Sequence, residues 1–254
     1  MPNSKDLTIV LQNNNVLYDT TSYAEESFAF APFDYHGKAL CIPLKKSVFF
    51  ETEFILNTID KNDIIINEDL QTKKNYCKQV KKAISVIKSS NASKIVLSRK
   101  KEIDLKQFDI SILIKRLLNL YPNAFRYIWY HPQTGFWCGA SPEVLLEMER
   151  ISFATMALAG TQRVKKDAIP YWNFKELNEQ KIVVDSIAAS LQKVASVIRT
   201  SETYNYQAAS LVHLRTDITG TLKEGKNTLS MIASILHPTP AVCGTPQDYA
   251  KSYI

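Results

Sequence analysis

The sequence predicts an α+β protein in which antiparallel sheets pack with helices on the outside. Short apolar runs indicate strands, and long amphipathic segments indicate helices. These segments follow one another irregularly, without the β-α-β alternation of a parallel sheet and without an internal repeat. With 254 residues, 45% of them hydrophobic, the chain can bury the core of one large domain or two small ones.

The N-terminal quarter predicts short strands joined by loops. Residues 39–43 and 48–50 are apolar between polar flanks, and residues 57–69 are polar and acidic, as in a connector. The clearest helix spans residues 71–90, where apolar side chains recur at helical spacing and lysines cover much of the remaining surface. Thr72 is its expected N-cap.

The middle of the chain predicts a short strand, a helix and a hairpin. A strand at residues 95–97 follows Lys94 directly, and a helix at 109–120 is expected with Asp109 or Ser111 as its cap. Residues 125–140 predict a β-hairpin, because apolar segments flank the turn sequence His-Pro-Gln-Thr-Gly.

Strands and helices continue to the end of the chain. Strands are expected at 144–149 and 151–158, and again near residues 212–217, where apolar and polar side chains alternate. The expected helices are a long one at 174–198, a short one at 227–236 capped by Asn227, and one that begins just before Ile254.

Composition narrows the class of protein. The net charge of +6 fits either a solvated, lysine-rich surface or an acidic partner. We expect no nucleic-acid binding, because the basic helix lacks interleaved aromatic residues and an RNA motif. No signal sequence or membrane span is recognisable, so the cytoplasm is expected. The four cysteines form no CxxC pair, and buried, reduced thiols are expected.

Three ionisable residues stand where burial is expected. Lys94 opens an apolar strand, Glu143 lies between a tight turn and a strand, and Glu179 lies on the long helix. A buried lysine can become a general base, and a carboxyl among apolar neighbours can keep its proton and act as an acid. Taken singly, each also fits an exposed surface charge. GxGxxG, P-loop, HExxH and GxSxG motifs are absent from the sequence.

Six segments carry a recognisable pattern: SKIVLSRK (93–100), GASPEVLLEM (139–148), ALAGT (157–161), KELNEQKIVVD (175–185), LVHLRTDITGTL (211–222) and LHPTPAVCGTP (236–246). In this order they resemble the motifs of the chorismate-utilising enzymes, the family of isochorismate, salicylate, anthranilate and aminodeoxychorismate synthases. The match runs from about Phe28 to the end.

The resemblance implies an α/β/β/α fold and a catalytic pair. Residues 1–254 would form a single chorismate-binding domain, with a variable N-terminal part (1–65) and a catalytic core (66–254). Lys94 would activate the water that attacks C2 of chorismate, and Glu143 would protonate the departing C4 hydroxyl. Glu179 would ligate Mg²⁺, although glutamine rather than the usual histidine follows it.

The resemblance also implies substrate contacts. Gly160 would contact the side-chain carboxylate through its backbone, with Thr161 beside it. His213 would lie near the leaving hydroxyl, and Ala241 and Val242 would line the ring pocket.

Single positions favour one branch of the family. Aminating members lack the lysine found here as Lys94, and aminodeoxychorismate synthases carry a lysine where this chain has Ala159. Salicylate synthases usually have threonine at the position of Ala241. Isochorismate synthase is therefore the first expectation and salicylate synthase the alternative. Whether the product serves menaquinone or a siderophore stays open.

The resemblance ends before the family pattern does. Family members continue with a Gly-rich stretch, substrate-binding residues and a second Mg²⁺ glutamate, none of which has a counterpart before Ile254. The expectation is a monomer that lacks the C-terminal part and is inactive or very weak alone. It would be an interrupted gene product, a fragment, or half of a split enzyme completed by a C-terminal fragment. The alternative to an enzyme is a catalytically inactive remnant.

Overall fold

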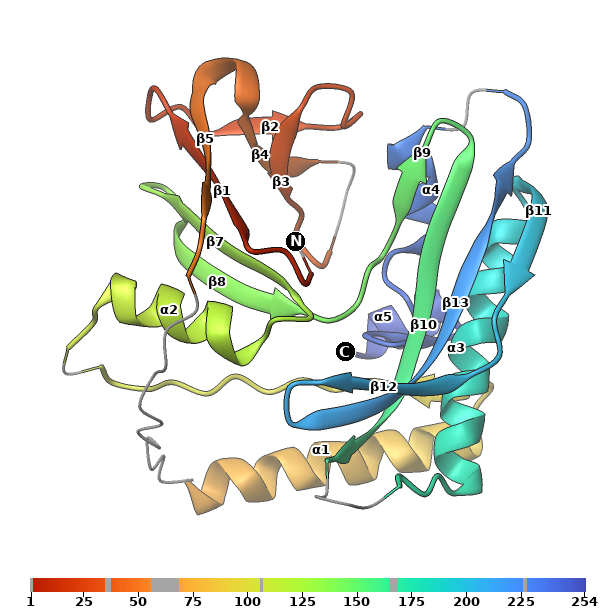
Figure 1. The fold of residues 1–254 in the computed structure, drawn as a ribbon. Helices are drawn as coiled ribbons and strands as arrows, with labels where there is room; N and C mark the ends of the chain where they lie inside the picture. Colours follow the sequence, from red (N-terminus) through yellow and green to blue (C-terminus); the bar gives the residue numbers. More distant parts are fainter. Residues whose placement is uncertain (1, 35–37, 56–68, 106, 165–168, 226–227) are drawn as a thin grey trace.

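The computed structural model describes residues 2–34, 38–55, 69–105, 107–164, 169–225 and 228–254. Within these ranges, every pair of neighbouring strands is antiparallel, which confirms the predicted α+β class with antiparallel sheets (Figure 1). No helix of the described ranges is long and apolar enough to cross a membrane. The predicted connector at 57–69 lies outside them, except for Asp69.

The largest sheet of the described chain has the strand order β11-β13-β10-β9, with β12 paired to the first half of β13. The predicted alternation near residue 212 is confirmed, because Val212, Leu214, Thr216 and Ile218 are buried on one face of β13. The strands are β9 (Glu147–Glu149), β10 (Ser152–Arg163), β11 (Ala195–Thr200), β12 (Tyr204–Ala208) and β13 (Leu211–Leu222).

Helices α3 (Phe174–Gln192) and α4 (Leu229–Leu236) pack with this sheet to form the main core. The fully buried side chains of α3 are Val183, Ile187 and Leu191, spaced four apart along one face. In Figure 1, α3 and the large sheet lie on one side of the molecule, and the small N-terminal sheets lie on the other.

The predicted extension of the long helix to Ile198 is wrong. The helix ends at Gln192, and residues 195–200 form β11 instead. Val197 and Ile198 are β-branched, and they pair with the second half of β13, so the sheet edge overrides the helical pattern.

The N-terminal strands and the predicted hairpin form small sheets that contact one another. Phe28 lies with its ring centroid 6.0 Å from that of Trp129, and Phe30 lies 5.6 Å from Trp137. The hairpin at 125–140 is confirmed as β7 and β8. The elements are β1 (Asp6–Gln12), β2 (Tyr18–Thr20), β3 (Ser27–Phe30), β4 (Ala39–Pro43), a 3₁₀ turn (Leu44–Lys46), β5 (Ser47–Glu53), β7 (Phe125–His131) and β8 (Gly135–Ser141).

The remaining helices and strands come from both halves of the chain, and the last residue lies between the two groups of sheets in Figure 1. β6 pairs with β14, so Ile95 meets Gly244 and Lys94 meets Thr245, although 149 and 151 positions separate them in the sequence. The elements are α1 (Leu70–Ser89), β6 (Lys94–Ile95), α2 (Ile110–Leu120), β14 (Gly244–Thr245) and α5 (Gln247–Tyr253).

The helix caps agree with the sequence in one case and differ in two. Asp109 caps α2, as predicted. Asp69, not Thr72, caps α1, because its carboxylate accepts from the backbone N–H groups of Gln71 and Thr72. The side chain of Thr228 caps α4, whereas Asn227 lies outside the described residues.

Two further expectations need correction. Cys41 and Cys243 are buried, but Cys77 and Cys138 are exposed, because they lie on outward-facing positions of α1 and β8. All four thiols are free. The strand expected from residue 144 begins only at Glu147, because the preceding residues leave the sheet as a loop.

Candidate active site

Lys94 lies on β6 and is only 8% exposed. Its strand is held against β14, where Gly244 makes the close approach possible. Gly244 has a φ of +150°, and a Cβ at this position would lie 2.2 Å from the Lys94 carbonyl oxygen. Since side chains cannot occupy that space, glycine is needed for the two strands to pair.

The ammonium group of Lys94 contacts a carboxylate on α3. Lys94 Nζ lies 3.3 Å from Glu179 Oε1, and Lys175 Nζ lies 3.1 Å from Glu179 Oε2. Burial lowers the pKa of Lys94, and the nearby negative charge of Glu179 only partly opposes this. Burial also raises the pKa of Glu179, but the two ammonium groups outweigh it and hold that pKa below its usual value.

A capping box positions the first turns of this helix. The Asn173 side chain accepts from the backbone N–H of Glu176, and the Glu176 carboxylate accepts from the backbone N–H of Asn173. Glu176 is therefore engaged at the helix start, whereas Glu179, on the next turn, reaches Lys94.

Glu143 lies in the loop between β8 and β9. The Ser141 hydroxyl donates to the Glu143 carbonyl at 3.0 Å, and the Thr155 hydroxyl donates to the Leu145 carbonyl at 2.7 Å, so the loop is held on both sides. Burial raises the pKa of Glu143 to about 7, and the opposing attraction of Lys94 does not cancel this. The carboxyl therefore keeps its proton in a substantial fraction of molecules near neutral pH.

Lys94 and Glu143 lie close enough for the charge of each to affect the pKa of the other. The two residues come from motifs far apart in the sequence. Burial favours the neutral form of both groups, which is the state in which a lysine can accept a proton and a carboxyl can donate one.

Three of the predicted substrate-binding residues meet at a bulge between β10 and β13. The strand register shifts between Ala159 and Thr161, and Gly160 adopts a φ of +71° there. His213 Nδ1 lies 3.1 Å from both the Thr161 hydroxyl and the Gly160 carbonyl oxygen. Burial lowers the pKa of His213, so its ring is neutral near pH 7.

The two predicted ring-pocket residues have different surroundings. Ala241 packs against the main core. Val242 is 45% exposed and lines an open cavity of about 490 Å³, together with Val96 and Ser98, which follow Lys94 along the chain. This volume lies within the range of small-molecule sites.

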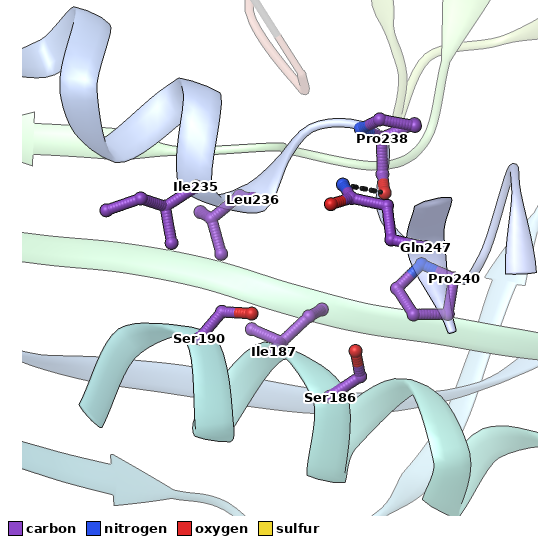
Figure 2. A pocket seen from close by; sticks show the side chains of 8 residues that line it. All are labelled: Ser186, Ile187, Ser190, Ile235, Leu236, Pro238, Pro240 and Gln247. Atoms are coloured by element: carbon purple, nitrogen blue, oxygen red, sulfur yellow. Dashed lines mark hydrogen bonds between the residues drawn. The ribbon is translucent and has the colours of Figure 1, made fainter. Parts of the chain in front are cut away.

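A second cavity lies between α3, the end of α4 and the loop that follows it. It measures about 40 Å³, which is room for water but not for a metabolite. Figure 2 shows Ser186 and Ser190 of α3 facing this loop, where the Gln247 side chain donates to the Pro238 carbonyl at 2.9 Å. None of the predicted site residues lines this cavity.

Sequence reasoning missed two residues beside Glu179. Lys175 could have been found from its position one helical turn before Glu179, where opposite charges attract. Gln180 is buried, and its amide donates to the Thr216 hydroxyl at 2.7 Å. The Thr216 hydroxyl also shares a hydrogen bond of 2.8 Å with the Thr203 hydroxyl. The sequence gives no sign that Gln180 is buried, because a polar side chain on a helix usually faces solvent.

The part of the chain that the structure describes contains no group of three or more His, Cys, Asp or Glu side chains arranged to hold a metal. Magnesium is commonly bound through one or two carboxylates and several waters. Glu179, half-buried and 3.3 Å from Lys94, fits one such ligand.

Comparison with known proteins supports a common origin. Residues 44–254 match the family model described as "Chorismate binding enzyme". The chain is 30% identical to isochorismate synthase MenF of Bacillus subtilis over 219 residues, which cover 81% of this chain and 46% of that protein. It is 25% identical to isochorismate synthase EntC of Escherichia coli over 202 residues, 76% of this chain and 51% of that protein.

Solved structures show the same fold. DhbC from Bacillus anthracis superposes with a TM-score of 0.76 at 21% identity, over 98% of this chain and 77% of that one. The chain spans about half the length of the curated relatives it matches. Because the family model covers most of the sequence, from residue 44 to residue 254, the chain belongs to the chorismate binding enzyme family.

Proposed function

We propose that this chain carries the acid–base site of an isochorismate synthase, which converts chorismate to isochorismate. The observation that carries the proposal is the proximity of the buried Lys94 and the half-buried Glu143, whose pKa values desolvation shifts towards the neutral forms. The names of the relatives MenF and EntC support the same reaction.

In the proposed reaction, neutral Lys94 takes a proton from a water molecule as its oxygen bonds to C2 of the ring. The double bonds shift, the C4–oxygen bond breaks, and protonated Glu143 gives its proton to the departing hydroxyl. One water enters and one leaves, so substrate and product are isomers. A base on one side of the ring and an acid on the other are what this step requires.

Glu179 would hold magnesium, which neutralises the ring carboxylate of the dicarboxylate substrate when it is bound. The ammonium group of Lys175, 3.1 Å from Glu179, favours the ionised carboxylate that a metal ligand must be, also when Lys94 is neutral. The backbone at Gly160, with Thr161 and neutral His213, would orient the substrate beside the pair, and Val242 would contact the ring.

The proposal is tested by separating binding from turnover, because the chain spans about half the length of its relatives. Binding of chorismate is measured by calorimetry with and without Mg²⁺, and products are separated by liquid chromatography. Isochorismate is the expected product, and salicylate would favour the alternative branch. Absence of both binding and turnover would exclude the proposal.

Lys94→Ala and Glu143→Gln test the assigned roles. Each is expected to lower turnover by at least about a hundredfold, the usual contribution of a general acid or base, while the fold is retained. Circular dichroism and chorismate affinity serve as controls. Turnover close to wild type in either variant would contradict the role given to that residue.

A further inference from the structure

The hydroxyl of Thr245 has no hydrogen-bond partner among the residues that the structure describes, and it is inaccessible to solvent. The rest of this residue is well bonded. Its carbonyl oxygen accepts from the backbone N–H of Ser93 at 2.8 Å and from the Ser93 hydroxyl at 3.3 Å. The unpaired group is therefore a single hydroxyl on an otherwise fixed strand.

Strand pairing puts this hydroxyl on the face of Lys94. β6 and β14 are antiparallel, and Thr245 is the direct partner of Lys94 in their register. Side chains directly opposite each other in an antiparallel pair lie on the same face, with Cβ atoms about 5 Å apart. The Lys94 side chain on this face extends to Glu179, so the Thr245 side chain lies on the face of the strand pair from which Lys94 reaches that carboxylate.

An unpaired buried hydroxyl destabilises the protein that contains it. It has lost its hydrogen bonds to water and gained none, whereas valine has nearly the same shape and loses nothing. Threonine at this position is therefore unfavourable in the free protein. It becomes favourable when a bound molecule supplies a polar atom.

We propose that Thr245 is a substrate-contacting residue whose hydroxyl hydrogen-bonds to a carboxylate or hydroxyl oxygen of the molecule bound beside Lys94. The inference rests on the proposed function, under which this molecule is chorismate. A hydroxyl can donate to either kind of oxygen, and no bond of the substrate is made or broken in the contact.

The test has two parts. The first measures the stability of the ligand-free protein, and the second measures its affinity for chorismate. Thr245→Val is expected to leave the urea midpoint unchanged or higher, because it removes an unpaired hydroxyl. Thr155→Val is the matched control, since the buried Thr155 hydroxyl does have a partner, the Leu145 carbonyl at 2.7 Å. The control is expected to lower the midpoint.

With chorismate and Mg²⁺, Thr245→Val is expected to raise the dissociation constant about tenfold, the loss of one hydrogen bond to a charged group. Thr245→Ser, which keeps the hydroxyl, is expected to bind within about twofold of wild type. A lower urea midpoint for Thr245→Val would mean that the hydroxyl is already paired in the free protein, and would overturn the inference.

An unchanged dissociation constant in Thr245→Val would also overturn the inference, while leaving the proposed function intact if wild type binds. Failure of wild type to bind chorismate would count against the proposed function itself. The urea comparison between Thr245→Val and Thr155→Val needs no ligand, so it separates the two failures.

Discussion

At the scale of single residues, the carboxyl of Glu143 links the site to stability. Burial raises its pKa from the usual 4.5 to about 7, so the folded protein holds this proton more tightly than the unfolded chain does. The resulting stabilisation is complete below pH 4.5 and is lost as the pH rises through 7. One pH unit corresponds to about 1.4 kcal/mol, so the loss is about 3 kcal/mol.

Glu143→Gln keeps the shape of the protonated side chain and carries no charge at any pH. Its free energy of unfolding is expected to exceed that of wild type by a margin that grows between pH 4.5 and 7 and is constant above. Urea unfolding at several pH values measures the margin. A difference that does not change with pH would show that Glu143 ionises as easily in the folded as in the unfolded protein.

At the scale of elements, the pairing of β6 with β14 holds Lys94 in the site. Gly244→Ala would place a Cβ 2.2 Å from the Lys94 carbonyl oxygen, so the strands must separate. The expected loss of stability exceeds about 2 kcal/mol, because a backbone clash adds to the strain of positive φ. Turnover should fall with it, since Lys94 moves.

Gly135→Ala is the matched control for this prediction. Gly135 also has positive φ, at +75°, but a Cβ there would meet no atom within 4 Å. Gly135→Ala is therefore expected to lower the free energy of unfolding only by the backbone strain of a non-glycine residue at positive φ, about 1 kcal/mol. Equal costs for the two variants, measured by urea unfolding, would argue against a clash at Gly244.

At the scale of the whole molecule, aromatic side chains join the N-terminal strands to the β7–β8 hairpin. The Phe28 ring lies 6.0 to 6.4 Å from the rings of Phe125, Tyr127 and Trp129. Phe28→Ala is expected to lower the free energy of unfolding by about 2 to 3 kcal/mol. It is also expected to speed amide hydrogen exchange in β2, β3 and β4.

Phe49→Ala provides the control for that change, because Phe49 lies on β5 and is 47% exposed. Its expected cost is below about 1 kcal/mol. If Phe28→Ala costs no more than Phe49→Ala, the aromatic contacts do not hold the two parts together.

The sequence by itself determined which residues are candidates for the chemistry and most of the elements that hold them. Helical spacing, the Asp109 cap and the alternation along β13 are local patterns, and they predicted α1, α2, the β7–β8 hairpin and β13. The six motifs identified Lys94, Glu143 and Glu179 through resemblance, and the structure brings Lys94 within 3.3 Å of Glu179.

Only the tertiary structure decided what surrounds those residues. The end of α3 at Gln192 depends on the free edge of β13, and the burial of Gln180 depends on Thr216 beneath it. The pKa shifts of Lys94 and Glu143 depend on burial and on each other's charge, although the two residues are far apart in the sequence. The position of the unpaired Thr245 hydroxyl depends on the pairing of β14 with β6. Local patterns carry no information on such contacts, because desolvation and charge act through space and not along the chain.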